Sequence, residues 1–182
     1  MEFEAKIIEF LQAGACQEWT VFFRIISLLG SWVGFLIAFI IIFMYSKRYA
    51  TIFGITYGVG VGLNYIIKLI VARARPYEAF SDIQMLTSAL GNSFPSGHSV
   101  SVTIIAFFVT VFVFKKSQNK FIRYGTLISM LLYAGLVFLS RMYLGAHYLT
   151  DVIAGICVGL LMCMICYIIY RKVRALMIKE KV

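Results

Sequence analysis

Long apolar runs restrict what this chain can fold into. A helix of about 20 apolar residues crosses the hydrocarbon core of a bilayer, and five runs approach or exceed that length. Soluble domains carry about 25% charged residues, whereas this chain has 14%, with 62% hydrophobic residues and a mean hydropathy of +0.90. The sequence therefore predicts an all-α fold, a polytopic transmembrane helical bundle, with spans at residues 19–45, 49–71, 98–114, 121–139 and 147–170.

The N-terminal segment is a candidate helix of a different kind. Its apolar residues recur at helical spacing between charged ones, but the segment is too short to cross a bilayer easily. We expect one integral membrane domain with an interfacial helix over residues 1–18, a helical bundle over 19–170 and a basic tail over 171–182. A sixth span formed by the N-terminal helix is the alternative.

The net charge of +9 has a simple distribution along the chain. Basic residues follow the first, third and fifth runs, which lie on one side of the membrane if the spans alternate, and nearly all acidic residues fall on the other side. Because basic loops stay in the cytoplasm, we expect a cytoplasmic C-terminus, with loops 72–97 and 140–147 and the N-terminal helix outside. The charge reflects orientation in the lipid bilayer, so we expect no nucleic-acid partner, and no obligate protein partner is evident.

Glycines in the second and fifth runs are spaced for helix packing. Gly54, Gly58 and Gly62 recur every four residues, as do Gly155 and Gly159. Small residues at this spacing let helices approach closely in lipid. A nucleotide-binding loop would need a preceding strand, and none is expected here.

Ionisable residues collect at the outer ends of the spans, where such groups are candidates for function. Lys68 and Arg75 are seven residues apart, almost two helical turns, so we expect them on one helix face. Pro76 disfavours helical geometry at Arg75 and should end the helix there. Arg73 projects elsewhere, and we interpret it as a cation that snorkels to the membrane edge.

The stretch "SFPSGHSVSV" at residues 93–102 forms a second group. Pro95 and Gly97 should start a helix near Ser96, whose hydroxyl can cap it. The first N–H groups of that helix are unpaired and, with the helix dipole, favour an anion. The alternative is an ordinary helix cap with an incidental histidine, His98.

The stretch "SRMYLGAHYLTD" at residues 140–151 forms a third group. His147 and Asp151 are four residues apart and should be neighbours on one helix face. A carboxylate bonded to one ring nitrogen fixes the imidazole tautomer and leaves the other nitrogen free as a nucleophile or base. Arg141 adds a cation nearby.

Together the three groups suit a phosphate. Cations and amides can hold its oxygens, while one histidine attacks phosphorus and the other protonates the leaving oxygen. A Mg²⁺ site needs several carboxylates, and Asp151 is the single carboxylate among these residues. We therefore expect no metal and no cofactor, and activity that survives EDTA.

Three spaced motifs carry a resemblance to a known family: Lys68-x6-Arg75-Pro76, Pro95-Ser96-Gly97-His98 and Ser140-Arg141-x5-His147-x3-Asp151. They resemble the type-2 phosphatidic acid phosphatase superfamily, which includes vanadium haloperoxidases and glucose-6-phosphatase. The resemblance implies a helical bundle in which His147 is the nucleophile that forms a phosphohistidine, Asp151 orients it and His98 is the general acid. It also implies phosphoryl-binding residues, namely Lys68, Arg75, Ser96, Gly97 and Arg141.

The expected substrate is a membrane lipid phosphate that enters sideways from the outer leaflet. Loop 77–94 is short, with one small helix expected near residues 82–90, so no large cap covers the site. Similar small bacterial members of the family dephosphorylate undecaprenyl pyrophosphate, phosphatidylglycerophosphate or phosphatidic acid. The resemblance does not choose among these three lipids.

The same residues admit other functions. A lipid phosphotransferase would pass the phosphoryl group from the histidine to a hydroxyl, and a transporter would use the polar groups without catalysis. A haloperoxidase is a weaker alternative because such enzymes are mostly soluble. The roles of Arg24, Asn64, Tyr143 and Tyr148 stay open at this point.

Overall fold

The computed structural model describes residues 2–179, with side chains described for residues 2–172. All regular structure in this range is helical, which confirms the predicted all-α fold. The helices are α1 (Glu2–Gln12), α2 (Gln17–Leu29), α3 (Trp32–Tyr45), α4 (Lys47–Val71), α5 (Pro76–Ala79), α6 (Gly97–Lys116), α7 (Lys120–Tyr143) and α8 (Leu149–Lys179).

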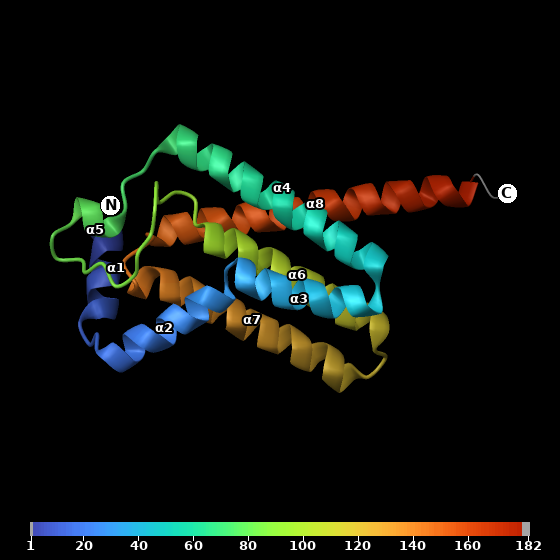
Figure 1. The fold of residues 1–182 in the computed structure, drawn as a ribbon, viewed down its shortest axis with the longest axis horizontal. Helices are drawn as coiled ribbons and strands as arrows, with labels where there is room; N and C mark the ends of the chain where they lie inside the picture. The colour runs from blue at the N-terminus through green and yellow to red at the C-terminus, as the bar shows by residue number, and fades with distance from the viewer. Residues whose placement is uncertain (1, 180–182) are drawn as a thin grey trace.

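Helix α6 lies at the centre of the bundle and packs against α3, α4, α7 and α8 (Figure 1). Its first half is almost completely buried, with Val100, Val102 and Ile104 fully inaccessible. Helices α1 and α5 and the loop before α6 gather at one end of the bundle, while α8 extends beyond its neighbours at the other (Figure 1). The predicted basic tail therefore begins inside α8. Its last three residues, and the side chains beyond residue 172, lie outside the described part.

Four of the described helices are long and apolar enough to cross a membrane, namely α4, α6, α7 and α8. Helices α2 and α3 form a fifth crossing if the pair, which is bent by 47°, counts as one span. The unbroken first span expected at residues 19–45 is therefore wrong. Gly30 allows the bend because α2 ends there directly against Val137, and the Ser31 hydroxyl accepts from the N–H of Val33 at 3.3 Å to start α3.

Helix α1 lies at the end of the bundle that also carries α5. Ala5 and Ile8 are buried against Ile83, whereas Phe3 and Phe10 on the opposite side are 73% and 81% exposed. The helix thus has a packed face and a free apolar face. An 11-residue helix is about 16 Å long, too short to cross a bilayer, so this division fits a helix at the membrane interface.

The glycine face predicted on α4 is displaced. A Cβ atom at Gly58 or Gly62 would meet nothing within 4 Å, whereas one at Gly60 would lie 2.8 Å from Cδ1 of Ile104. The prediction is confirmed at Gly54, where a Cβ atom would lie 3.1 Å from Cε2 of Phe39. It failed at Gly58 and Gly62 because four-residue spacing alone does not identify the buried face. The buried stripe of α4 runs through Ala50, Phe53, Thr56, Gly60 and Asn64.

Candidate active site

Lys68 and Arg75 meet in space, but not on one helix face as expected. Helix α4 ends at Val71, and Ala72 takes a left-handed conformation with φ 49°. Both cations reach the carbonyl oxygen of Asn92, from Lys68 Nζ at 2.6 Å and from Arg75 Nη2 at 3.4 Å. Asn92 in turn donates to the carbonyl oxygen of Lys68 at 2.9 Å. The loop before α6 therefore brings the two cations together.

Arg75 ties this loop to the segment before His147. Its Nε donates to the carbonyl oxygen of Gly91 and its Nη1 to that of Ala146, both at 2.8 Å, and its side chain is buried. Arg75 also begins α5, the one short helix between α4 and α6 in the described chain. The small helix expected near residues 82–90 is absent from these described residues. The helix that does form in this loop, α5, starts earlier, at Pro76.

The start of α6 lies where the sequence predicts it. Ser96 is the extended N-cap residue, and its hydroxyl accepts from the N–H of Ser99 at 3.4 Å. The N–H of Ser96 donates to the carbonyl oxygen of Asp151 at 2.9 Å, which fixes this helix start against α8. Gly97 and His98 follow in the first turn and are half-buried. The amides of a first helical turn lack partners within the helix and can hold an anion.

A tight turn presents His147 between α7 and α8. Gly145 has φ 71°, and the N–H groups of Ala146 and His147 both donate to the carbonyl oxygen of Arg141, at 3.1 and 3.2 Å. His147 precedes the first residue of α8, so it does not share a helix with Asp151 as expected. Its Nδ1 nevertheless lies 3.6 Å from Oδ2 of Asp151. Pairing of Nδ1 with Asp151 would leave the other ring nitrogen, Nε2, for a substrate.

Asp151 is fully buried and held from two sides. Its Oδ2 accepts from the N–H of Tyr148 at 2.9 Å, and its Oδ1 accepts from Nη1 of Arg73 at 2.7 Å. The interpretation of Arg73 as a snorkelling cation is therefore wrong. Helical spacing placed it elsewhere, but α4 has already ended before this residue. The sequence signal for that early end is weak, because no glycine or proline stands at Ala72.

Arg141 is buried near the middle of these groups. Its Nη1 donates to the hydroxyl of Ser27 on α2, a contact that sequence spacing could not reveal, and its Nε has no partner. Within the described residues, no carboxylate lies within 4 Å of the side-chain nitrogens of Lys68, Arg75 or Arg141. The pocket thus holds a surplus of positive charge, because Arg73 already pairs with Asp151.

The electrostatic environment keeps His147 neutral. Burial, together with the positive charges of Arg141 and Arg75, holds the pKa of the His147 imidazole well below its usual value. A neutral imidazole has a free lone pair and can attack an electrophile. The described residues contain no group of three or more His, Cys, Asp or Glu side chains that could hold a metal ion.

The four residues left open by the sequence have definite positions. Asn64 is buried beside the start of α6, with its Oδ1 unpaired. The guanidinium of Arg73 lies over the ring of Tyr148, with Cζ 3.9 Å from the ring centre. Tyr143 packs inside the bundle and accepts from Gln12 Nε2 through its carbonyl oxygen at 2.9 Å. Arg24 lies at the surface, where its Nε donates to a loop carbonyl oxygen at 2.8 Å.

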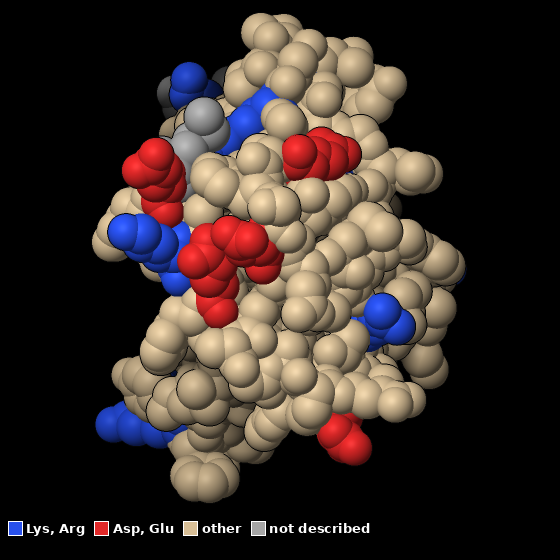
Figure 2. Space-filling view, turned by 90° about the vertical axis from the view of Figure 1, so that its left-hand side faces the viewer, with Lys and Arg blue, Asp and Glu red and all other residues tan. Residues whose placement is uncertain are grey.

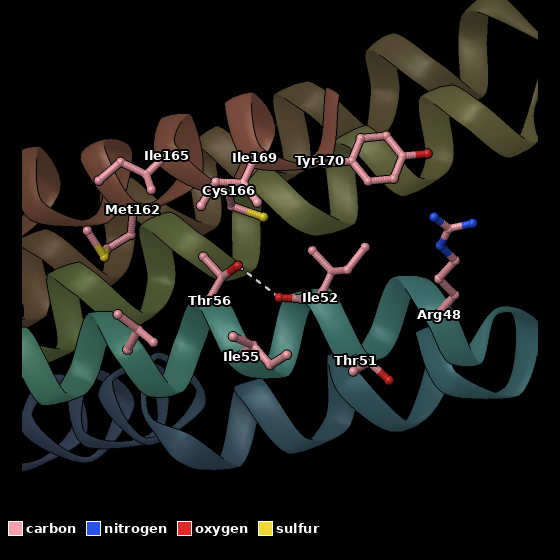
Figure 3. Close-up of a pocket in the computed structure, with 11 residues that line it drawn as sticks. Arg48, Thr51, Ile52, Ile55, Thr56, Met162, Ile165, Cys166, Ile169 and Tyr170 are labelled. Atoms are coloured by element: carbon pink, nitrogen blue, oxygen red, sulfur yellow. Dashed lines mark hydrogen bonds between the residues drawn. The ribbon is translucent and has the colours of Figure 1, made fainter. Parts of the chain in front are cut away.

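A large groove between α4 and α8 is separate from these groups (Figure 3). Its volume is about 520 Å³, and it extends from Val59 and Met162 to Arg48 and Tyr170. The hydroxyl of Thr56 donates to the carbonyl oxygen of Ile52, one turn earlier, at 2.8 Å (Figure 3). Its proton is therefore not available to a ligand in the groove. None of the candidate site residues lines the groove, and the chemistry therefore lies elsewhere.

Known proteins are similar to this chain in sequence and in fold. The sequence profile described as the PAP2 superfamily matches residues 49–175. A phosphatidylglycerophosphatase B of Bacillus subtilis is 36% identical over 107 residues, which cover 55% of this chain and 47% of that protein. A lipid A 1-phosphatase of Rhizobium etli is 34% identical over 113 residues, covering 59% and 44%. The matches thus span less than half the length of these curated relatives.

Solved structures agree with the bundle. The transmembrane PAP2-type phosphatidylglycerolphosphate phosphatase from Bacillus subtilis superposes with a TM-score of 0.76 at 26% identity, covering 94% of this chain and 86% of that one. Aquifex aeolicus LpxE gives a TM-score of 0.74 at 22% identity, covering 89% and 93%. With apolar helices long enough to span a bilayer and all three motifs gathered at one end of them, the chain is a membrane protein of the PAP2 superfamily.

Proposed function

We propose that this protein is a lipid phosphatase that hydrolyses a phosphomonoester or diphosphate of a membrane lipid through a phosphohistidine. The observation that carries the proposal is the positive surplus around His147. Buried cations without a carboxylate partner are costly in a low-dielectric site, and a phosphate supplies the missing negative charge. Lys68, Arg75 and Arg141, together with the amides at Ser96 and Gly97, are the proposed phosphate ligands.

The proposed first step is attack by Nε2 of His147 on phosphorus. A bond from nitrogen to phosphorus forms while the bond from phosphorus to the leaving oxygen breaks, and His98 gives that oxygen its proton. Asp151 faces Nδ1 of His147 at 3.6 Å and stabilises the positive charge that develops on the ring. In the second step, the oxygen of a water molecule bonds to phosphorus while the bond from phosphorus to Nε2 of His147 breaks. The deprotonated His98 accepts a proton from that water, inorganic phosphate leaves, and His147 returns to its neutral form.

We propose that the site faces the outer side of the membrane, with the C-terminus in the cytoplasm. Acidic side chains are spread over the end that carries α1 and α5 (Figure 2), and Glu2, Glu18, Glu78 and Asp82 are exposed there. At the opposite end, Lys115 and Lys116 end α6 and Lys120 begins α7. Basic loops are retained in the cytoplasm, so this asymmetry favours an outward site.

The substrate class follows from the position of the site beside the apolar spans. The candidate residues lie at the ends of α4, α6, α7 and α8, so the head group of a lipid can reach them while its tails stay in the bilayer. The relatives described above include a phosphatidylglycerophosphatase and a lipid A 1-phosphatase. Undecaprenyl pyrophosphate, phosphatidylglycerophosphate and phosphatidic acid are the candidates we propose to test.

A phosphate-release assay tests the proposal directly. Purified protein in detergent is offered each of the three lipids, with and without EDTA, and with glycerol as a possible acceptor. We expect release of inorganic phosphate from at least one lipid, unchanged by EDTA. Transfer to glycerol in place of phosphate release would identify a phosphotransferase. Release at the wild-type rate by a His147→Asn protein would refute the proposed nucleophile.

A further inference from the structure

Arg73 joins two acidic groups that lie far apart in the sequence. Its Nη1 donates to Oδ1 of Asp151 and to the hydroxyl of Thr150, both at 2.7 Å, and its Nη2 donates to Oε2 of Glu4 at 3.0 Å. The guanidinium also covers the ring of Tyr148 at 3.9 Å. A side chain with this many directed contacts has a fixed position, unlike a cation that reaches for lipid head groups.

Glu4 connects the N-terminal helix to the start of α8. Its Oε1 accepts from both the N–H and the hydroxyl of Thr150, each at 2.8 Å. Burial acts to raise the pKa of Glu4, but the hydrogen bonds from Thr150 and Arg73 outweigh it and lower that pKa. Glu4 is therefore a carboxylate at neutral pH, placed at the positive end of the α8 dipole.

Asp151 depends on a cation to remain charged. A buried carboxylate without a partner loses its hydration and becomes protonated, and Asp151 is fully inaccessible. Arg73 forms a salt bridge with Oδ1 of Asp151, while Oδ2 faces His147 at 3.6 Å. The salt bridge therefore also fixes the orientation of the carboxylate toward His147. Rotation of the carboxylate would break both contacts.

We propose that Arg73 is a positioning residue for the His147–Asp151 pair, and that Glu4 of α1 holds Arg73 in place. This inference rests on the proposed function of the same site. Arg73 does not bind the phosphate in this scheme, because two carboxylates already neutralise it. The N-terminal helix thereby acquires a role in catalysis through a single side chain.

The test replaces Arg73 and follows the pH profile. In Arg73→Gln, Asp151 loses its ion-pair partner, while Lys68 and Arg75 stay near it without forming an ion pair. Asp151 therefore protonates more easily, and the acid limb of kcat should move to higher pH. We expect kcat to fall by about 10- to 100-fold, the range for loss of a partner that orients a reactive group, with KM changed less than twofold. Arg73→Lys keeps the charge and should restore the position of the acid limb but not the full rate.

Glu4 provides a second arm of the same experiment. Glu4→Gln should lower kcat less than Arg73→Gln and should leave the acid limb in place, because Arg73 still neutralises Asp151. The double variant should be no slower than Arg73→Gln alone, since groups that act through one another are not additive. Arg24→Gln is the matched control. It removes another guanidinium at the same end of the bundle and should leave kcat and the profile unchanged.

The outcomes separate this inference from the proposed function. A raised KM at unchanged kcat in Arg73→Gln would make Arg73 a substrate ligand and overturn the inference. The inference would also be overturned if the pH profile of Arg73→Gln were unchanged and its lower activity matched a lower amount of folded protein. If the wild-type protein releases no phosphate from any lipid, the proposed function fails. The inference is then decided by NMR of labelled histidine, where Arg73→Gln must lower the fraction of His147 with the proton on Nδ1.

Discussion

A Cβ atom on Gly155 of α8 would lie 2.5 Å from the backbone carbonyl oxygen of Ser96, the cap of α6. The two helices that supply Asp151 and His98 thus touch through their backbones just below the candidate site. Gly159, one turn further along α8, makes a similar approach to Thr103. This confirms the close packing predicted for the two glycines and makes the relative position of the catalytic groups sensitive to one methyl group.

Gly155→Ala is therefore expected to reduce activity strongly. The added methyl group meets backbone rather than a flexible side chain, so the start of α6 must shift, and a displacement of about 1 Å can reduce a rate about 100-fold. The measurement is kcat on the preferred lipid phosphate. Gly125→Ala in α7 is the control because its Cβ would meet nothing within 4 Å. Equal activity of the two variants would contradict the claim that the close backbone contact between α6 and α8 positions the catalytic groups.

His98→Ala should affect substrates according to their leaving group. A general acid contributes roughly 10²- to 10⁴-fold, so we expect a loss in this range for a lipid alkoxide, which needs a proton to leave. An aryl phosphate such as p-nitrophenyl phosphate has a leaving group that needs no proton. The loss of activity on this substrate should therefore be much smaller. Equal losses for both substrates would remove His98 from the role of general acid.

His147 should remain neutral at pH values at which an ordinary histidine is protonated. Its pKa lies below the usual value of about 6.5 because of burial and the nearby cations, and a group with a lowered pKa becomes charged only at lower pH. Titration of labelled histidine by NMR is practical because the chain has 2 histidines. Arg141→Gln should raise the pKa of His147. A titration of His147 in the wild type at or above 6.5 would contradict the electrostatic description.

Cys16 offers a direct test of orientation. It is exposed at the N-cap of α2, at the end of the bundle that carries the candidate site. A membrane-impermeant maleimide should label it in intact spheroplasts. In a Cys16→Ser, Gln118→Cys protein, the exposed loop cysteine between α6 and α7 should react only after permeabilisation. The reverse pattern would place the site in the cytoplasm.

Much of the fold followed from the apolar runs because a bilayer allows few structures. Four of the five predicted crossings, the start of α6 near Ser96 and the gathering of the three motifs were all predictable. The bend between α2 and α3 was not predictable, because residues 19–45 form one continuous stretch without proline and the break depends on contacts of Leu29 and Gly30 with α7. Hydropathy reports the length of a segment in lipid but not its direction.

The candidate site shows the same division. Spacing identified every motif residue, yet it misjudged Arg73, because the assumption of a continuous helix failed at Ala72. Ser27 and Glu4 could not be found either. Their contacts with Arg141 and Arg73 join segments separated by much of the chain, and single polar residues near a membrane edge carry no distinctive pattern.

The bend after Leu29 has a mechanical consequence. The carbonyl oxygen of Leu29 accepts from the hydroxyl of Tyr133 at 2.6 Å, and the N–H groups of Gly30 and Ser31 each donate to a carbonyl oxygen of α2 at 3.1 Å. A hinge motion at this joint would have to break these hydrogen bonds, and unpaired backbone groups are costly in the apolar interior of a membrane protein. The connection between α2 and α3 is therefore rigid. It fixes the angle between α2 and α3, and with it the position of Ser27 beside Arg141, independently of the thickness of the surrounding bilayer.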